Sequence, residues 1–339
     1  MANKSDKKQT VSLSQIAEAV GVSKMTVSRV IRNADGYSEA TREKVMREIE
    51  RHGYQTIRLG ANTGHVESST VVGVCVPALS GYLMTQTLES LGNTLERFGF
   101  QMMLGCHNNQ LAQEESWLKQ LVAWRPAGVL LCSKYHSQKT TRMLREADLP
   151  VLEFWELNTS PIRLSVGFNE YDAGFEMSQH ARFKGYENAA LLLATQDSNA
   201  VSPARVKGFE TGFQAGDGQV VHTEILNDQP SFYAGYYGTE LLFNHGHSFD
   251  MIYYMNDDMA IGGLAWCQRK GIRVPEDVGI AGWGGHEAAS ILPLRLTTTQ
   301  IPVIQIGKLS AEQLVRSLKG EETQNVSAVP ARLVDGDTV

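Results

Sequence analysis

Short apolar runs alternate with amphipathic stretches along residues 70–339. The runs TVVGVCVP (70–77), FQMMLGC and AGVLLCS are continuous, and a stretch with helical spacing of its apolar residues separates each from the next. Continuous apolar runs are typical of strands buried on both faces, and their alternation with helices indicates a parallel sheet. The pattern starts again at LSVGFN (164–169) and continues through AALLLAT, VVHTEIL, DMIYYMN, DVGIAGWG and LTTTQIP. We therefore expect an α/β body of two Rossmann-like, doubly wound, parallel-sheet subdomains, with a ligand cleft at the carboxyl ends of their strands.

The first 60 residues instead follow a helical period. Ser12 and Gln15 fit a capping box, and the apolar positions after them predict a first helix that Gly21 ends. Ser23 can cap a second helix whose apolar side carries Val27, Val30 and Ile31. Residues 33–36 predict a turn, and Ser38 can cap a third helix that ends at Gly53. This order predicts an all-α helix-turn-helix head, although a three-helix bundle used for protein contact would show the same pattern.

The outward side of the second predicted helix is polar and basic, formed by Lys24, Met25, Thr26, Ser28, Arg29 and Arg32. Such a helix fits the major groove of B-DNA, where side chains near its N-terminus reach base edges. We expect Lys24 and Met25 to stand at that end and Arg29 to pair with a guanine or a phosphate. The residues that we expect to bind DNA are Ser14, Ser23, Lys24, Met25, Thr26, Ser28, Arg29, Asn33, Thr41 and Arg58.

The charge distribution supports a separate role for this head. The net charge is −6, yet residues 1–60 contain 11 Lys and Arg against 7 Asp and Glu, while the remainder contains 20 against 30. A basic head on an acidic body suggests that only the head meets a polyanion, although clustering by chance would look similar. The four Cys lie in apolar runs, and no run approaches the ~18 residues of a membrane span. We expect a cytoplasmic protein with reduced thiols and no membrane association.

Residues 11–54 closely resemble the head of the lactose-repressor (LacI/GalR) family of transcription regulators. AEAVGVS, TVSRVI, TREKV and GY occur in that family's order and spacing, and the resemblance implies that the Lys24–Met25 pair, Arg29 and Asn33 contact operator DNA. The resemblance extends over nearly the whole chain, through the stretches NDDMAIGGL, GIRVPEDVGIAGW, RVKGFETGF and LTTTQIP. It implies that the body has the fold of the periplasmic sugar-binding proteins. Within the family, the chain is most similar to the gluconate-utilisation repressors, on the basis of KM before TVSR and of the stretches VGFN, GHE and TQIP.

The segment after the head departs from the family pattern. Family members carry a hinge helix with a leucine that enters the minor groove, whereas here Leu59 comes early in QTIRLGANTGHVESS and only Arg58 matches a basic family position. The segment is equally typical of a flexible linker. We expect a DNA-binding domain at 1–54, a hinge or linker at 55–69, and an effector-binding and dimerisation domain at 70–339. The N-subdomain would comprise about 70–168 plus 301–328, and the C-subdomain about 169–300 plus 329–339.

The resemblance also implies an effector site. Arg205 stands where many family members hold a sugar oxygen, although an exposed helix arginine is the alternative. Asn256 and Asp257 match the family's Asn-Asp pair, although Asn256 alone would also cap the next helix. Gly284 replaces an Asp of many sugar-binding members, which favours an acidic sugar. The expected effector-binding residues are Tyr82, Lys134, His136, Trp155, Arg205, Asn256, Asp257, Trp283 and His286, of which Lys134 and His136 would add positive charge.

Other chemistries find little support in the sequence. The pair His245 and His247 has no third ligand at helical spacing, so a turn is favoured over a metal site. Phosphate-loop, dinucleotide and nucleophile-elbow motifs are absent, so we expect no cofactor and no enzyme. The sequence therefore predicts a homodimeric repressor that binds a near-palindromic operator and is released by gluconate or a related sugar acid. The alternatives are a neutral sugar or nucleoside effector, a corepressor mechanism, a sugar-binding module without regulatory work, and an α/β enzyme.

Overall fold

The computed structural model describes residues 13–31, 35–51, 69–194 and 203–339, which form two units divided between residues 69 and 70. Predictions for Ser12, Arg32, Asn33, Gly53 and Arg58, and for nearly all of the 55–69 linker, lie outside the described residues. We describe each unit by itself and refer to residues 13–51 as the head and to residues 70–339 as the body.

The head contains three helices, α1 (Leu13–Val20), α2 (Lys24–Ile31) and α3 (Glu39–Arg51). Their apolar sides meet in a small core of Ile16, Ala17, Val27, Val30 and Val45. Gly21 has a φ of 73°, the left-handed conformation that a tight turn between two helices requires. This arrangement is the helix-turn-helix that the sequence predicts.

The first lobe of the body, the N-lobe, is built on a sheet with the order β11-β5-β4-β3-β1-β2, all parallel. Its strands are β1 (Val71–Val76), β2 (Gln101–Cys106), β3 (Gly128–Leu131), β4 (Val151–Glu156), β5 (Leu164–Phe168) and β11 (Val326–Ala328). Helices α4 (Tyr82–Arg97) and α12 (Val303–Leu318) cover one face. Helices α5 (Leu111–Ala123) and α6 (Gln138–Glu146) cover the other. Side chains therefore alternate along β1 between two cores, with Val72, Val74 and Val76 in one and Cys75 in the other.

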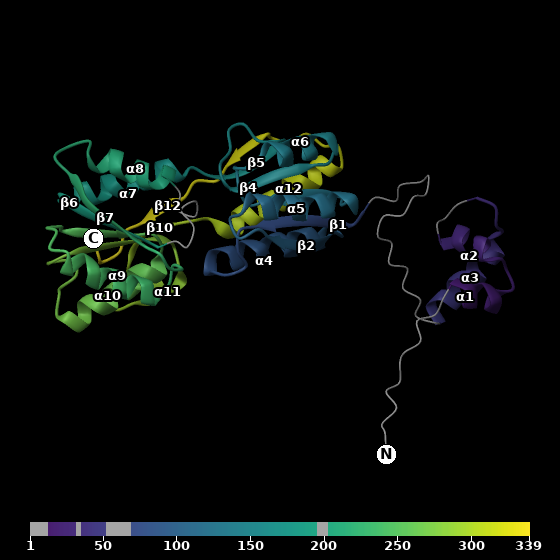
Figure 1. The fold of residues 1–339 in the computed structure, drawn as a ribbon, viewed down its shortest axis with the longest axis horizontal. Coiled ribbons are helices and arrows are strands. Elements are labelled where there is room, and N and C mark those ends of the chain that lie inside the picture. The colour runs from purple at the N-terminus through teal and green to yellow at the C-terminus, as the bar shows by residue number, and fades with distance from the viewer. Residues whose placement is uncertain (1–12, 32–34, 52–68, 195–202) are drawn as a thin grey trace, which may run out of the picture. The chain divides into compact units, whose positions relative to one another are not determined.

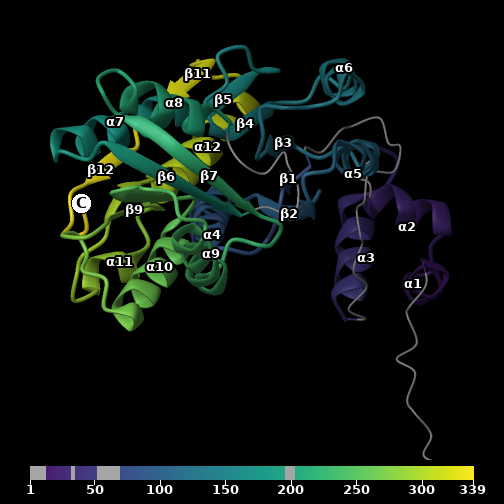
Figure 2. The ribbon, with the colours of Figure 1, turned by 60° about the vertical axis from the view of Figure 1, so that its left-hand side comes forward.

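The second lobe, the C-lobe, repeats this plan with the sheet order β12-β10-β9-β8-β6-β7. Its strands are β6 (Asn188–Ala194), β7 (Gln219–Leu226), β8 (Met251–Tyr254), β9 (Gly279–Gly284), β10 (Thr297–Gln300) and the antiparallel β12 (Arg332–Val334). Helices α7 (Glu170–Phe183) and α8 (Pro203–Phe213) pack on one face of the sheet, while α9 (Phe232–Asn244) and α10 (Asp257–Lys270) pack on the other (Figures 1 and 2). The short helix α11 (Glu287–Ile291) follows β9.

The structure confirms the predicted fold class. The strand LSVGFN, with which the apolar pattern starts again, pairs with β4 and belongs to the first sheet, within the residues 70–168 expected for the N-subdomain. Strands β11 and β12 have no counterpart among the predicted elements, and they return the chain to β5 and then to β10. The chain consequently passes between the lobes three times, after β5, after β10 and after β11. None of the helices in the described residues is long and apolar enough to span a lipid bilayer.

Candidate functional site

The N-terminal end of α2 is a solvent-facing surface with a preformed helix cap. The Ser23 hydroxyl accepts a hydrogen bond from the Thr26 backbone N–H at 3.0 Å and lies 2.9 Å from the Thr26 hydroxyl. Lys24 and Arg29 are exposed, and the Met25 side chain has 61% of its surface accessible. A large exposed apolar side chain at this position fits contact with the methyl group of thymine in a major groove. Ser14, Thr26, Ser28 and Thr41 are half-buried.

The arginines of α3 differ from those of α2 in their partners. Arg42, Arg47 and Arg51 pair with glutamates one turn away on the same helix, with N–O distances of 2.9, 3.1 and 3.4 Å. Within the described part of the chain, neither Lys24 nor Arg29 forms an ion pair. The positive charge of α2 is therefore available to an external anion, while the charge on these arginines is balanced internally. Ser38 caps α3 and lies 2.9 Å from the Thr41 hydroxyl.

In the body, side chains at the carboxyl ends of both sheets contact one another. We call Tyr82, Phe168, Glu170, Arg205, Trp283 and His286 the interlobe cluster. The Tyr82 ring, at the start of α4, lies 4.2 Å from the His286 ring of the C-lobe. Phe168, at the end of β5, lies 5.8 Å from Trp283 on β9, measured between ring centroids. The cluster thus joins the two lobes where open α/β sheets bind their ligands.

Arg205 is buried at the centre of this cluster. It has only 5% of its surface exposed, which excludes the alternative of an exposed helix arginine. Its guanidinium lies 4.1 Å from the centroid of the Trp283 ring, and its Nε lies 3.8 Å from the Glu170 carboxylate. Stacking on an aromatic ring leaves the edge of the planar guanidinium free to bind a bidentate ligand.

Close packing of α7 against α8 sets the position of Arg205 relative to Glu170. A Cβ atom at Gly174 would lie 2.2 Å from the Arg205 carbonyl oxygen, and one at Gly208 would lie 2.1 Å from the Tyr171 carbonyl oxygen. Only glycine permits these helices to approach so closely, because any side chain would meet backbone atoms. The two helix N-termini are thereby held side by side, with Glu170 on one and Arg205 on the other.

Glu170 is the titratable group of the cluster that the sequence analysis missed. Burial raises the pKa of its carboxyl to about 7, although the positive charge of Arg205 opposes the shift. A carboxyl with this pKa is partly protonated at neutral pH, so Arg205 faces an acid that does not fully balance its charge. No pattern in the sequence indicates this role, since an acidic residue in the first turn of a helix is common for electrostatic reasons alone.

Asn256 and Asp257 hold the loop after β9 in place. The Asn256 side chain caps α10 by accepting a hydrogen bond from the Met259 N–H at 2.9 Å, which favours the alternative that the sequence analysis left open. Asp257 is buried, and its two oxygens accept hydrogen bonds from the Thr298 hydroxyl and the His286 N–H, both at 2.6 Å. Both acceptor oxygens thus take part in internal hydrogen bonds, through which Asp257 braces the His286 loop.

Lys134 and His136 do not supply the unpaired positive charge that we expected. The Lys134 ammonium pairs with Glu156. The His136 side chain is 3% exposed, with Nδ1 at 2.9 Å from Glu114 and Nε2 at 3.2 Å from Glu153. Burial by itself would lower the pKa of His136, but the two glutamates outweigh it and raise the pKa to about 9. The His136 side chain therefore belongs to a buried charge cluster with Glu114 and Glu153, where its positive charge is balanced by these two carboxylates.

The remaining polar atoms near Arg205 include two that sequence reasoning missed. Tyr253 on β8 and Thr299 on β10 are buried, and their hydroxyls interact with each other close to Arg205. The apolar run DMIYYMN gives no indication that one of its tyrosines lies beside Arg205. Trp155, one of the expected effector-binding residues, is half-buried at the end of β4 with a φ of 95°. A bulky residue in that region is strained, a feature that clusters at ligand sites.

Comparisons with known proteins agree with both units. A family model for bacterial regulatory proteins of the lacI family matches residues 12–56, and one for the periplasmic binding protein-like domain matches residues 178–339. The chain belongs to the lacI family of transcriptional regulators. This confirms the resemblance noted in the sequence and establishes the chain as a DNA-binding regulator.

Individual relatives extend over most of this regulator. The HTH-type transcriptional regulator GntR of Escherichia coli (strain K12) is 29% identical over 318 residues, covering 93% of this chain and 94% of that protein. A crystal structure of a LacI family transcriptional regulator from Silicibacter pomeroyi has 28% identity and a TM-score of 0.86, covering 97% of this chain and 99% of that one. The transcription regulator GntR from Chromobacterium violaceum has 28% identity and a TM-score of 0.74, covering 79% and 98%. These three relatives are transcription regulators and not enzymes.

Proposed function

We propose that this regulator represses genes of sugar-acid catabolism, that gluconate or a related sugar acid binds at the interlobe cluster, and that the bound acid releases operator DNA. The buried Arg205 guanidinium beside Glu170 is the observation that carries the proposal. An arginine binds a carboxylate through two parallel hydrogen bonds, and a protonated Glu170 can donate a hydrogen bond to a ligand oxygen. The similarity to GntR proteins and the Gly284 position support an acidic effector.

The same proposal assigns the DNA contacts. Lys24, Met25 and Arg29 lie on the exposed side of α2, and the positive charges of Lys24 and Arg29 suit phosphates or a guanine edge. The regulator would bind a near-palindromic operator as a homodimer, because a two-fold protein matches two half-sites. Effector binding between the lobes would change their relative orientation and so the spacing of the two heads. The ligand shifts this equilibrium only by its differential affinity for the two states.

The test is fluorescence anisotropy of labelled DNA from the upstream region of the regulator's own gene, at fixed salt concentration. The expected result is nanomolar binding that gluconate reverses, with Arg205→Ala binding DNA normally but no longer responding to gluconate. The variant should remain folded, because Glu170 loses a positive neighbour and can stay protonated. Tight binding that gluconate leaves unchanged would refute the sugar-acid effector. Tighter binding with gluconate would instead identify it as a corepressor, and an absence of specific binding would refute the assigned operator.

A further inference from the structure

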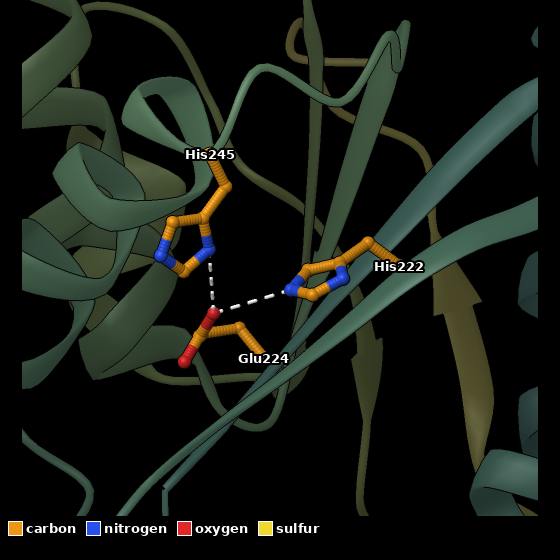
Figure 3. A group of neighbouring side chains, drawn as sticks. All are labelled: His222, Glu224 and His245. Carbon is orange, nitrogen blue, oxygen red and sulfur yellow. Dashed lines mark hydrogen bonds and ion pairs between the residues drawn. The ribbon is translucent and has the colours of Figure 1, made fainter.

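A second group of chemically capable side chains lies on the C-lobe, outside the interlobe cluster. His222 and Glu224 extend from β7, and His245 follows the last turn of α9 (Figure 3). Nε2 of His222 lies 3.1 Å from Oε2 of Glu224, and Nδ1 of His245 lies 3.2 Å from the same oxygen. The potential ligand atoms of all three residues lie within 4.8 Å of one another. We call these three residues the β7–α9 triad.

The fold brings the triad together through two local features. Ala189 of β6 pairs with Val220, but the next residue, Ala190, pairs with His222, so Val221 is an extra residue in β7. This bulge turns His222 and Glu224 toward the face of the sheet that α9 covers, where Leu226 joins the core. The second feature is the end of α9, where His245 is the C-cap residue. Gly246 follows it in the left-handed conformation, with a φ of 73°.

The donor set fits a transition-metal ion. Two imidazole nitrogens and one carboxylate oxygen form a ligand set that Zn²⁺ accepts, whereas Mg²⁺ and Ca²⁺ prefer oxygen ligands throughout. Zn²⁺ bonds of about 2.0–2.1 Å in a tetrahedron place ligand atoms roughly 3.3 Å apart. The two N–O distances of 3.1 and 3.2 Å already match that spacing, so only the two histidine nitrogens need to adjust.

We propose that the β7–α9 triad binds one Zn²⁺ ion per chain, with a water molecule as the fourth ligand. The side chains of His222, Glu224 and His245 are 24%, 17% and 43% exposed, which gives an ion access from solvent while Glu224 stays largely covered. The ring of His247 stacks on His222 at 4.2 Å and limits its rotation. The ion would connect the edge strand of the sheet to the end of α9 and so stabilise this side of the C-lobe.

The triad answers the argument against a metal site at His245, which was that no further ligand stands at helical spacing from it. The pair His245 and His247 has no third ligand at helical spacing, but the missing ligands come from a strand about 20 residues earlier in the chain. Sequence spacing on one helix cannot show a ligand that a sheet edge supplies. The proposal is independent of the effector, because it rests on residues outside the interlobe cluster.

The test uses full-length protein without an affinity tag, stripped with a chelator and titrated with Zn²⁺ by calorimetry and by competition with a fluorescent zinc chelator. We expect one ion per chain and a higher melting temperature with Zn²⁺. Loss of a residue that only hydrogen-bonds to a metal ligand weakens metal binding about 10- to 100-fold. Because His245 and Glu224 would be ligands themselves, His245→Ala and Glu224→Gln should each weaken Zn²⁺ binding at least about 100-fold.

His180→Gln is the matched control, because His180 lies on α7 and contacts Asp335 instead of the triad. It should bind Zn²⁺ as the unmodified protein does. Co²⁺ should give the visible spectrum of a tetrahedral site in the unmodified protein and in His180→Gln, but not in His245→Ala. Equal Zn²⁺ affinity in His245→Ala and the unmodified protein would overturn the proposal. The same conclusion would follow if the unmodified protein bound no stoichiometric ion.

Discussion

Replacing Glu170 with Gln isolates the effect of one buried carboxyl group, because the amide has the shape of the protonated acid and no charge. The pKa of Glu170 is about 7 in the folded protein, against 4.5 for the group without the burial that raises it. A group with a raised folded-state pKa contributes stability that is fully present below its unfolded pKa and lost as the pH rises through its folded pKa. Over about 2.5 pH units, at about 1.4 kcal/mol per unit, the loss amounts to roughly 3.5 kcal/mol in the free energy of unfolding.

Urea unfolding followed by tryptophan fluorescence, at pH 5, 6, 7 and 8 and one protein concentration, measures this effect. Glu170→Gln and the unmodified protein should be about equally stable at pH 5, and the variant should be more stable by up to roughly 3.5 kcal/mol at pH 8. Contributions of other titrating groups, including His136, cancel in the difference. Glu176→Gln, the same substitution at an exposed position of the same helix, is the matched control in these measurements. A stability difference for Glu170→Gln that is constant with pH would refute the reasoning.

The same carboxyl should control the pH dependence of effector binding. An anionic effector near Arg205 favours the protonated form of Glu170, so its affinity should fall about tenfold for each pH unit above 7. The affinity of Glu170→Gln should change little over that range. Calorimetric titration of gluconate from pH 6 to pH 9 measures both slopes. Parallel slopes for the two proteins would show that Glu170 does not face the bound acid.

Three further predictions test other parts of the structure. Arg29→Ala should weaken operator binding. If Arg29 contacts a phosphate, the slope of log K against the logarithm of the salt concentration should become smaller in magnitude by about one, which anisotropy at several salt concentrations measures. His136→Gln should destabilise the body by about 3–5 kcal/mol at pH 7, because two buried glutamates lose their cation. The free-energy difference should shrink as the pH rises from 7 to about 9 in thermal unfolding, because His136 of the unmodified protein loses its proton over that range. Gly208→Ala should lower the free energy of unfolding by about 1–3 kcal/mol and weaken effector binding, because its Cβ would meet the Tyr171 carbonyl. Gly216→Ala is the control in the same assays, because its Cβ would meet only the flexible side chain of Arg182 at 3.4 Å.

The elements of the body could be predicted from the sequence wherever an element is long enough to carry a periodic pattern. Strands such as β1 and β8 are apolar runs buried on both faces, so they are recognisable without their neighbours. β11 and β12 contain only three residues each and exist because β5 and β10 offer them partners. A strand of this length has no period of its own, so its pairing is settled by distant residues.

The candidate sites divide in a similar way. The sequence by itself determined the helix-turn-helix, the two-sheet body and the family, because these rest on local spacing and on motifs. Only the tertiary structure decided that Arg205 faces Glu170, that His136 lies between Glu114 and Glu153, and that His245 meets His222 and Glu224. Each of these arrangements joins residues from different elements. Charge, protonation and metal affinity depend on atoms within a few ångströms in space, and packing between elements sets those distances.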